Sequence, residues 1–259
     1  MELGIAGKMA LVCASSKGLG KACALSLARE GVNVVMNGRT AETLDAAAEE
    51  ARATARGEVR TVCADITTPQ GRAAALEAAG APDILVNNAG GPPAGDFREW
   101  GLDEWNSALN ANMLTPIELI RATVDGMAER GFGRIINITS VSVKSPIPVL
   151  GLSNGARAGL TGFVAGVARQ VAARGVTING ILPGPFDTDR LRGTVRYVAE
   201  KSGRSFDAEF AERCAENPTG RVGQPAEFGE LCAFLCSAHA GFINAQNIVI
   251  DGGAFPGTL

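Results

Sequence analysis

The sequence predicts an α/β fold: a single domain with one parallel sheet of about seven strands and helices on both faces. Short apolar runs rich in β-branched residues alternate with turns and Ala/Leu-rich helical stretches, which is typical of βαβ units. The length of 259 residues fits one domain of this class. The expected strands are Met9–Cys13, Val32–Met36, Val59–Ala64, Ile84–Asn87, Arg134–Ile138, Val176–Leu182 and Asn247–Ile250.

Helical patterns fill the gaps between these strands. Because the strands are near-continuous apolar runs, we expect both faces of the sheet to be covered, as in a doubly wound, Rossmann-like fold. The stretch from 190 to 217 is more polar, and we expect it to form a small lid or substrate segment of a domain spanning residues 1–259. The expected helices are Lys21–Glu30, Ala41–Arg56, Gln70–Ala79, Asp103–Arg130, Asn154–Arg174 and Ala226–Cys236.

Composition and charge argue against two classes of partner. The chain has 24 Lys+Arg against 27 Asp+Glu and only 5% aromatic residues, whereas nucleic-acid binders carry basic patches and stacking aromatics. No apolar run reaches the roughly 18 residues that a membrane span needs, and Met1–Met9 lacks the apolar core of a signal peptide. We expect neither a nucleic-acid nor a membrane partner, and a cytoplasmic location.

The cysteine and histidine content argues against a metal site. Cys232 and Cys236 lie four residues apart on one face of an expected helix, but His239 is the only histidine in the chain. Buried small hydrophobic side chains are the better interpretation of these cysteines, so we expect no metal. A single histidine near the C-terminus also argues against Ser-His-Asp and Cys-His hydrolysis.

The turn after the first strand has the character of a phosphate-binding loop. It opens directly into a helix, so backbone N–H groups and the helix dipole could face an anion. A tight turn that merely needs glycine is the alternative. The turn contains Ala14, Ser16, Lys17, Gly18, Leu19 and Gly20.

The residues after the second strand indicate which dinucleotide would bind. Sites for NAD usually place an acid there for the ribose hydroxyls, but this chain has Arg39, and Lys17 projects from the first turn. Two cations near the adenosine ribose suit the 2′-phosphate of NADPH. Two solvated surface charges are the alternative.

With these features the chain resembles the short-chain dehydrogenase/reductase family, close to its 3-oxoacyl-[acyl-carrier-protein] reductase branch. The resemblance covers nearly the whole chain. It rests on Asp65 after the third strand, Asn87-Asn88-Ala89-Gly90 after the fourth, Asn112 on the long helix, Ser140 after the fifth strand, the loop 183–188, the segment 221–227 and Asp251-Gly252-Gly253.

The resemblance implies an NADP(H) site and a set of catalytic positions. The implied catalytic residues are Asn112, Ser140, Ser153 and Arg157. The implied cofactor-binding residues are Ala14, Ser16, Lys17, Gly18, Leu19, Gly20, Arg39, Asp65, Ile66, Asn88, Ala89, Gly90, Arg157, Pro183, Gly184, Phe186 and Thr188.

The chain departs from this family at the proton-transfer residues. Where the family has a tyrosine followed four residues later by a lysine, this chain has Ser153 and Arg157, and its only tyrosine is Tyr197. A serine hydroxyl is a far weaker acid than a phenol, and an arginine with a pKa above about 12 does not relay protons. Ala14 also replaces the first glycine of the phosphate loop, at little cost if its backbone angles are ordinary. The cofactor site is therefore expected to be kept and the usual proton donor lost.

Three functional hypotheses follow. The first is an NADPH-dependent oxidoreductase acting on a carbonyl or alcohol, or on a pre-protonated imine, with a non-standard proton source. That source would be Tyr197, Lys144, or a water held by Ser140, Ser153 and Asn112. An ordinary surface position is the alternative interpretation of Tyr197 and Lys144. The second is a nucleotide-binding pseudoenzyme or scaffold, and the third is a non-redox lyase or isomerase. We favour the first, because the residues expected around the nicotinamide are present.

The substrate is expected to be a small molecule that is apolar or acidic. The expected walls of its site, residues 91–95 and 141–150, are rich in Pro, Gly and aliphatic side chains, whereas the lid segment carries cations. A solvated helix face is the alternative interpretation of those cations, which are Arg190, Arg192, Arg196, Lys201 and Arg204. The resemblance further implies a homo-oligomer, a dimer or a tetramer.

Overall fold

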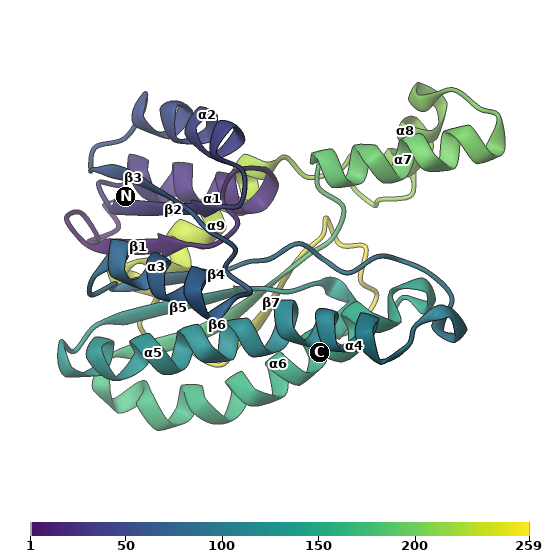
Figure 1. Ribbon diagram of the computed structural model, residues 1–259. Coiled ribbons are helices and arrows are strands. Elements are labelled where there is room, and N and C mark those ends of the chain that lie inside the picture. Colours follow the sequence, from purple (N-terminus) through teal and green to yellow (C-terminus); the bar gives the residue numbers. More distant parts are fainter. Residues whose placement is uncertain (1, 259) are drawn as a thin grey trace.

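A parallel seven-stranded sheet forms the centre of the molecule (Figure 1). The computed structural model describes residues 2–258, so the predicted domain limits, residues 1 and 259, lie outside the described part. All seven predicted strands are confirmed to within two residues at each end. They are β1 Met9–Val12, β2 Asn33–Gly38, β3 Val59–Cys63, β4 Ile84–Asn87, β5 Gly133–Ile138, β6 Val176–Pro183 and β7 Asn247–Ile250.

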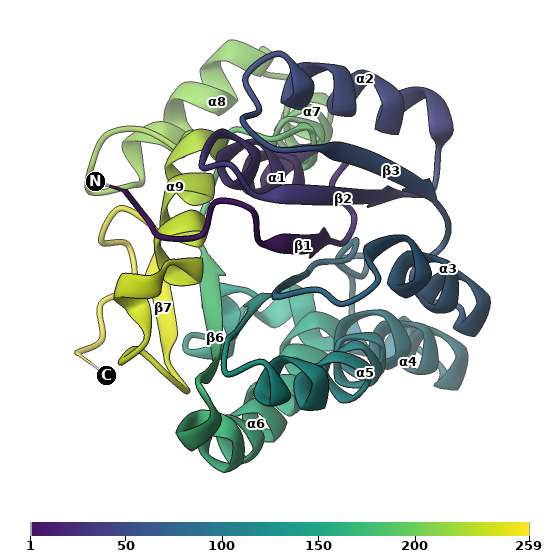
Figure 2. The same cartoon turned by 90° about the vertical axis from the view of Figure 1, so that its left-hand side faces the viewer.

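Helices cover both faces of this sheet. Helices α1, α2 and α9 contribute to one core and α3, α5 and α6 to the other, as Figures 1 and 2 show. The helices are α1 Gly18–Arg29, α2 Ala41–Arg52, α3 Pro69–Ala79, α4 Leu102–Leu109, α5 Thr115–Glu129, α6 Gly151–Val171, α7 Asp189–Ser202, α8 Phe206–Ala215 and α9 Pro225–Cys236.

Alternation along the strands explains why two cores form. In β1, Val12 packs into the core under α1 and α9, whereas Leu11 packs into the core under α5 and α6. Ile136 and Ile135 of β5 divide in the same way. Successive side chains of a strand point to opposite faces, so a strand that is apolar at every position has to be buried on both sides.

The strand order places a crevice above the middle of the sheet. The order is β3-β2-β1-β4-β5-β6-β7, so β1 lies between β2 and β4 and the direction of winding reverses there. The loops after β1 and β4 lead to opposite faces, and ligands of such sheets bind where these loops separate. The segments after β1 and β4, singled out from the sequence, therefore lie at the reversal.

The long helix predicted over Asp103–Arg130 differs from the structure at its centre. Helices α4 and α5 are continuous, but the turn between them, Asn110–Leu114, is π-helical. The side-chain amide of Asn112 donates to Ala108 O and to Gly90 O, both at 3.4 Å. A π-turn widens a helix and commonly marks a functional residue. Apolar periodicity does not reveal it, because both flanking helices keep their usual spacing.

The polar stretch from 190 to 217 contains two helices that the sequence analysis did not predict. Helices α7 and α8 pack on each other, with Val195 and Ala199 buried between them. Gly203 ends α7 in a left-handed conformation, and Ser205 caps α8 by accepting from Ala208 N. Figure 1 shows the pair, in light green, projecting beyond the body as an arm. Few of its residues are buried and its helices are rich in charged side chains, so no apolar run marks it in the sequence.

The cysteines on α9 lie in the core. Cys232 and Cys236 are fully buried and pack with Cys23 of α1, and all six cysteines of the chain are free thiols. Burial and the neighbouring thiols raise the pKa of Cys232 and of Cys236 well above the usual range. Within residues 2–258 no three His, Cys, Asp or Glu side chains are grouped as metal ligands. Over the same residues, no helix has both the length and the apolar character needed to cross a membrane.

Candidate active site

The turn between β1 and α1 presents the start of a helix without side-chain caps. Lys17 precedes α1 in an extended conformation, its side chain makes no capping hydrogen bond, and the first turn holds no acid. The first N–H groups of α1 are thus available to an anion, and the helix dipole favours one. Gly18, with φ of +55°, lets the chain turn into the helix at that point.

The same turn is held against the loop after β4. The side-chain amide of Asn88 donates to Ala14 O at 3.2 Å, and Ser15 N donates to Asn37 O at 2.8 Å. A Cβ at Gly20 would collide with Ala14 O and would lie 2.7 Å from the Asn88 amide nitrogen. Only glycine therefore allows α1 to start this close to the turn.

Ala14 adopts a left-handed backbone conformation with φ of +45°. The sequence analysis assigned little cost to alanine here, on condition of ordinary backbone angles. The structure does not meet that condition, because the backbone of Ala14 is left-handed. A Cβ in the left-handed region crowds the following carbonyl. The chain has kept the conformation of a glycine at this position while carrying a methyl group.

We expect Ala14→Gly to stabilise the protein by about 0.5–1 kcal/mol, since relief of left-handed strain outweighs the greater freedom of glycine in the unfolded chain. Urea unfolding of both proteins measures the difference. Ala53→Gly is the matched control, because exposed Ala53 ends α2 in a right-handed conformation and should lose about 0.5–1 kcal/mol. A loss at Ala14 would contradict the prediction.

The predicted adenosine end lies at the ends of β2 and β3. Arg39 follows β2 and forms no ion pair within residues 2–258. Asp65 follows β3, and hydrogen bonds from Thr67 N and Oγ1 lower the pKa of its carboxyl, with a smaller contribution from the charge of Arg39. Ile66 beside it is buried. Lys17 lies 4.0 Å from Asp189 of α7, in an exposed pair.

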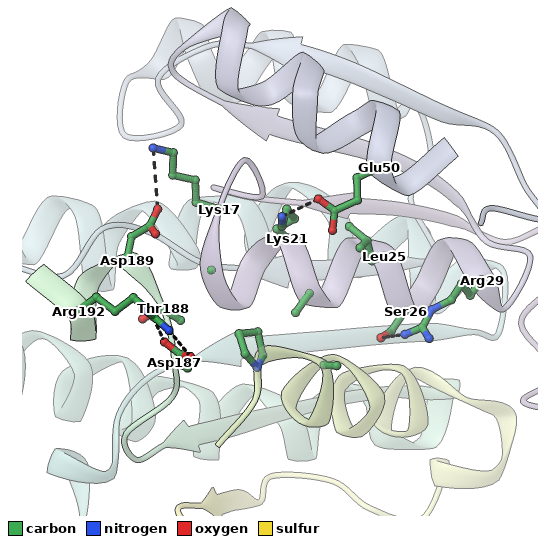
Figure 3. A pocket seen from close by; sticks show the side chains of 14 residues that line it. Lys17, Lys21, Leu25, Ser26, Arg29, Glu50, Asp187, Thr188, Asp189 and Arg192 are labelled. Atoms are coloured by element: carbon green, nitrogen blue, oxygen red, sulfur yellow. Dashed lines mark hydrogen bonds and ion pairs between the residues drawn. The ribbon is translucent and has the colours of Figure 1, made fainter. Parts of the chain in front are cut away.

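A cavity of about 390 Å³ lies between α1 and the first turns of α7 and α9. Its charges are paired, as Figure 3 shows: Lys21 lies 2.7 Å from Glu50, and Arg192 lies 2.6 Å from Asp187. None of the four predicted catalytic residues lines it. The cavity therefore adjoins the predicted phosphate end and is separate from the predicted reaction centre.

The loop after β6 closes over the phosphate turn. Thr188 caps α7, and its Cγ2 lies 3.6 Å from the Cβ position of Gly18. Gly184 has no room for a side chain beside Asp251, and Gly184 N donates to Ile250 O at 2.9 Å. Phe186 is buried edge-to-face on Phe228 at 5.5 Å.

The segment 221–227 supports the same loop. Asp187 N donates to Gly223 O at 2.8 Å, and Gly223 N donates to Pro185 O at 2.9 Å. Arg221 holds Glu227 through two hydrogen bonds of 2.7 Å, and this lowers the pKa of Glu227 to about 2. The segment 221–227 and Asp251-Gly252-Gly253 were separate motifs in the resemblance. In the structure both pack against the loop 183–188.

Ser153 and Arg157 form a buried pair on the first turns of α6. Arg157 Nε donates to Ser153 Oγ at 3.1 Å, and Arg157 Nη1 donates to Ile138 O at 2.7 Å, at the end of β5. Ser153 and Arg157 are 6% and 8% exposed. Because the Ser153 oxygen accepts from the guanidinium, its hydroxyl proton remains free to be donated elsewhere.

Burial and the nearby charge of Arg190 lower the pKa of Arg157 to about 10. The guanidinium still keeps its charge at neutral pH. Within residues 2–258 this buried guanidinium forms no ion pair.

Asn112 lies in the π-turn and Ser140 directly before the 3₁₀ turn Val141–Val143, and both turns pack against α6, which carries this pair. The Asn112 amide donates to Gly90 O, and its buried Oδ1 has no hydrogen-bond partner among residues 2–258. Ser140 begins a short 3₁₀ turn, where its Oγ accepts from Ser142 N at 3.1 Å. The unpaired Oδ1 is an acceptor that only an added donor such as water could satisfy.

The other proposed proton donors lie outside this group. Lys144 is exposed, with its ammonium 5.9 Å from the ring centroid of Phe255. Tyr197 is 56% exposed on α7, and its ring lies 4.7 Å from the ammonium of Lys201. Tyr197 and Lys201 have the four-residue spacing of the family's motif, on a helix of the arm.

From the sequence, Arg190 is expected only as one of the cations of the lid segment. In the structure its Nη2 donates to Pro92 O at 3.2 Å, and its guanidinium occupies the space that a side chain at Gly91 would fill. The position two residues after Thr188 was the available signal, because it places Arg190 in the first turn of α7.

Comparisons with known proteins match nearly the whole length of the chain. A family model described as enoyl-(acyl carrier protein) reductase matches residues 13–254. The chain is 31% identical over 259 residues to the 3-oxoacyl-[acyl-carrier-protein] reductase of Vibrio cholerae, covering 98% of this chain and 99% of that protein. It is 33% identical over 254 residues to gluconate 5-dehydrogenase of Gluconobacter oxydans, covering 96% and 95%.

A solved structure is similar over the same extent. L-sorbose reductase from Gluconobacter frateurii, complexed with NADPH and L-sorbose, superposes with a TM-score of 0.93 at 30% sequence identity. The similarity covers 98% of each chain.

Proposed function

The chain belongs to the short-chain dehydrogenase/reductase family, and on this premise we propose that it is an NADPH-dependent oxidoreductase that reduces a carbonyl group without a tyrosine acid. The observation that carries the proposal is the buried hydrogen bond of 3.1 Å between Arg157 and Ser153 at the end of β5. The alternatives are a nucleotide-binding pseudoenzyme and a non-redox lyase or isomerase.

Three features support NADP(H) as the cofactor. The uncapped start of α1 and the close packing at Gly20 would hold the diphosphate. Arg39 and Lys17 would bind the 2′-phosphate, and the loop 183–188 would border the nicotinamide. The complex of L-sorbose reductase with NADPH adds support, because that protein has the same fold.

NADPH, when bound, supplies the hydride. The Ser153 hydroxyl would donate to the substrate oxygen, and the Arg157 guanidinium, bonded to Ser153 Oγ, would stabilise the negative charge that develops there. Preorganised donors of this kind usually provide the largest part of catalysis. Ser153 would thereby act as an oxyanion donor, with its proton retained.

The proton that completes the alcohol would come from water. The unpaired Oδ1 of Asn112 is buried beside Gly90 and can accept a hydrogen bond from a water molecule. A water at this site could pass a proton to the substrate oxygen after hydride transfer. Tyr197 and Lys144 are exposed, and the structure places them beside Lys201 and Phe255 respectively, which favours water among the three proton sources.

The proposal is tested by titrating the protein with NADPH and NADH in a calorimeter and by following NADPH absorbance with a panel of ketones and aldehydes. We expect NADPH to bind more tightly and to be consumed with one alcohol formed per NADPH. Binding without consumption would indicate a pseudoenzyme, and a product formed without consumption would indicate a lyase or isomerase.

We expect Tyr197→Phe to keep kcat within about threefold of the wild type, since the exposed phenol is not the proton donor. Ser153→Ala should lower kcat about 10²-fold, the usual cost of one oxyanion donor. Both are measured by NADPH consumption on the best ketone of the panel. A Tyr197→Phe loss as large as that of Ser153→Ala would assign the acid to Tyr197.

A further inference from the structure

The start of α7 carries two arginines in contrasting situations. Arg192 is neutralised by Asp187, which accepts two hydrogen bonds of 2.6 and 2.8 Å. Arg190 forms no ion pair within residues 2–258, and its hydrogen-bond acceptor is the carbonyl of Pro92. One helix turn thus presents a paired cation and an unpaired one.

Arg190 is seated in a notch made by Gly91. Its Cζ lies 2.7 Å from the Cβ position of Gly91, and all the atoms that such a Cβ would meet first belong to Arg190. Gly91 follows directly on Gly90, whose carbonyl receives the amide of Asn112. The guanidinium therefore borders the group of predicted catalytic residues from the side of the arm.

Two guanidinium groups, those of Arg157 and Arg190, border this region, and neither forms an ion pair within residues 2–258. Arg190 lies close enough to Arg157 that its positive charge contributes to lowering the pKa of Arg157. Like charges disfavour each other, so an anion bound between Arg190 and the pair Ser153–Arg157 would remove an unfavourable interaction. A planar guanidinium matches a carboxylate through two parallel hydrogen bonds.

We propose that Arg190 in its Gly91 notch is the anchor for a carboxylate on the substrate, so that this protein reduces an oxo acid. This inference rests on the proposed function and names its substrate class. The reacting carbonyl would lie at Ser153 and the carboxylate at Arg190. The phosphates of the cofactor would lie elsewhere, at Gly18 and Lys17.

The test compares short 2-oxo, 3-oxo and 4-oxo acids with their methyl esters, acetoacetate and methyl acetoacetate among them. We expect the wild type to prefer the best acid over its ester by about 10- to 100-fold in kcat/KM, the value of a charge-assisted hydrogen bond. Arg190→Met should bring this ratio close to one. Gly91→Ala should lower it as well, because it displaces the guanidinium while keeping the charge.

Arg196→Gln is the matched control. It removes one positive charge from the same helix, and Arg196 lies over the ring of Phe206, away from Gly91. The ratio of acid to ester should stay at the wild-type value in this variant. If the ratio of acid to ester falls equally in Arg196→Gln and Arg190→Met, the proposal is wrong. The preference for acids would then come from the overall positive charge of the arm.

NADPH affinity separates the anchor from a cofactor contact. We expect Arg190→Met to bind NADPH within about threefold of the wild type by calorimetry. If NADPH affinity and the turnover of acid and ester all fall together, Arg190 serves the cofactor and the proposal is wrong. An unchanged ratio of acid to ester in Arg190→Met would overturn it too.

A thermal-shift measurement keeps the inference testable if no substrate is turned over, which would contradict the proposed function. Millimolar acetoacetate should raise Tm in the presence of NADP⁺, methyl acetoacetate should not, and Arg190→Met should abolish the difference. An equal response of the wild type to acid and ester would rule out the carboxylate anchor.

Discussion

Replacing Arg157 by methionine is expected to lower kcat/KM for carbonyl reduction by about 10³-fold, somewhat beyond the loss of a single oxyanion donor. Methionine keeps most of the volume but leaves Ser153 Oγ and Ile138 O without the donors they have at 3.1 and 2.7 Å. Ser153 would then lose both its orientation and the positive charge behind it. NADPH consumption at saturating cofactor measures the effect.

Two controls separate chemistry from folding and from cofactor binding. Arg157→Lys keeps a charge but cannot bond Ser153 and Ile138 through separate nitrogens of a fixed fork, so an intermediate loss of about 10-fold is expected. NADPH affinity, measured by calorimetry, should fall by less than kcat/KM. An Arg157→Met variant that is folded and as active as the wild type would show that the Ser153–Arg157 pair has no part in catalysis.

The second large effect is expected at the adenosine end. The double variant Lys17→Ala/Arg39→Ala should weaken NADPH binding by about 100-fold, since each cation contributes one charge-assisted contact to the 2′-phosphate. NADH affinity should change by less than about threefold, because NADH lacks that phosphate. Calorimetric titration of both nucleotides measures the change in preference.

Lys21→Ala is the control for charge near the phosphate turn. Lys21 also lies on α1, but it is paired with Glu50 at 2.7 Å, so its loss should leave the preference for NADPH in place. Equal weakening of NADPH and NADH in the double variant would mean that Lys17 and Arg39 act on the shared part of the nucleotide. NADPH binding should also weaken as salt rises, because both cations are exposed.

The pattern of apolar runs and turns in the sequence was enough to predict the strands of the sheet. Most strands are short apolar runs bounded by turns, and burial of the central strands on both faces leaves no polar alternation there. The edge strand β3, which contains Arg60 and Thr61 and is only partly buried, is the exception. The segments that would bind the cofactor were predictable for a related reason: in a parallel sheet they follow the strands directly, as Ala14 follows β1 and Asn88 follows β4. The loss of the tyrosine and lysine was visible at Ser153 and Arg157 without any structure.

The sequence pattern did not predict features in which contacts between distant residues override local preferences. The π-turn at Asn110–Leu114 depends on the hydrogen bond of Asn112 to Gly90, 22 residues away in the chain. Helices α7 and α8 bury few residues and carry many charged side chains, so no apolar run distinguished them from a polar loop. The left-handed conformation of Ala14 was hidden because alanine is not usually found there.

The sequence by itself determined the fold class, the order of the strands along the chain, the segments that end at the crevice and the absence of the usual tyrosine acid. Only the tertiary structure decided that Arg157 reaches Ile138 O and that Arg190 lies in the notch of Gly91, 99 residues earlier in the chain. The physical reason is that parallel strands bring their carboxyl ends to one edge whatever their separation in sequence. Which side chains then meet depends on the exact placement of helices, and that placement is set by packing across the whole domain.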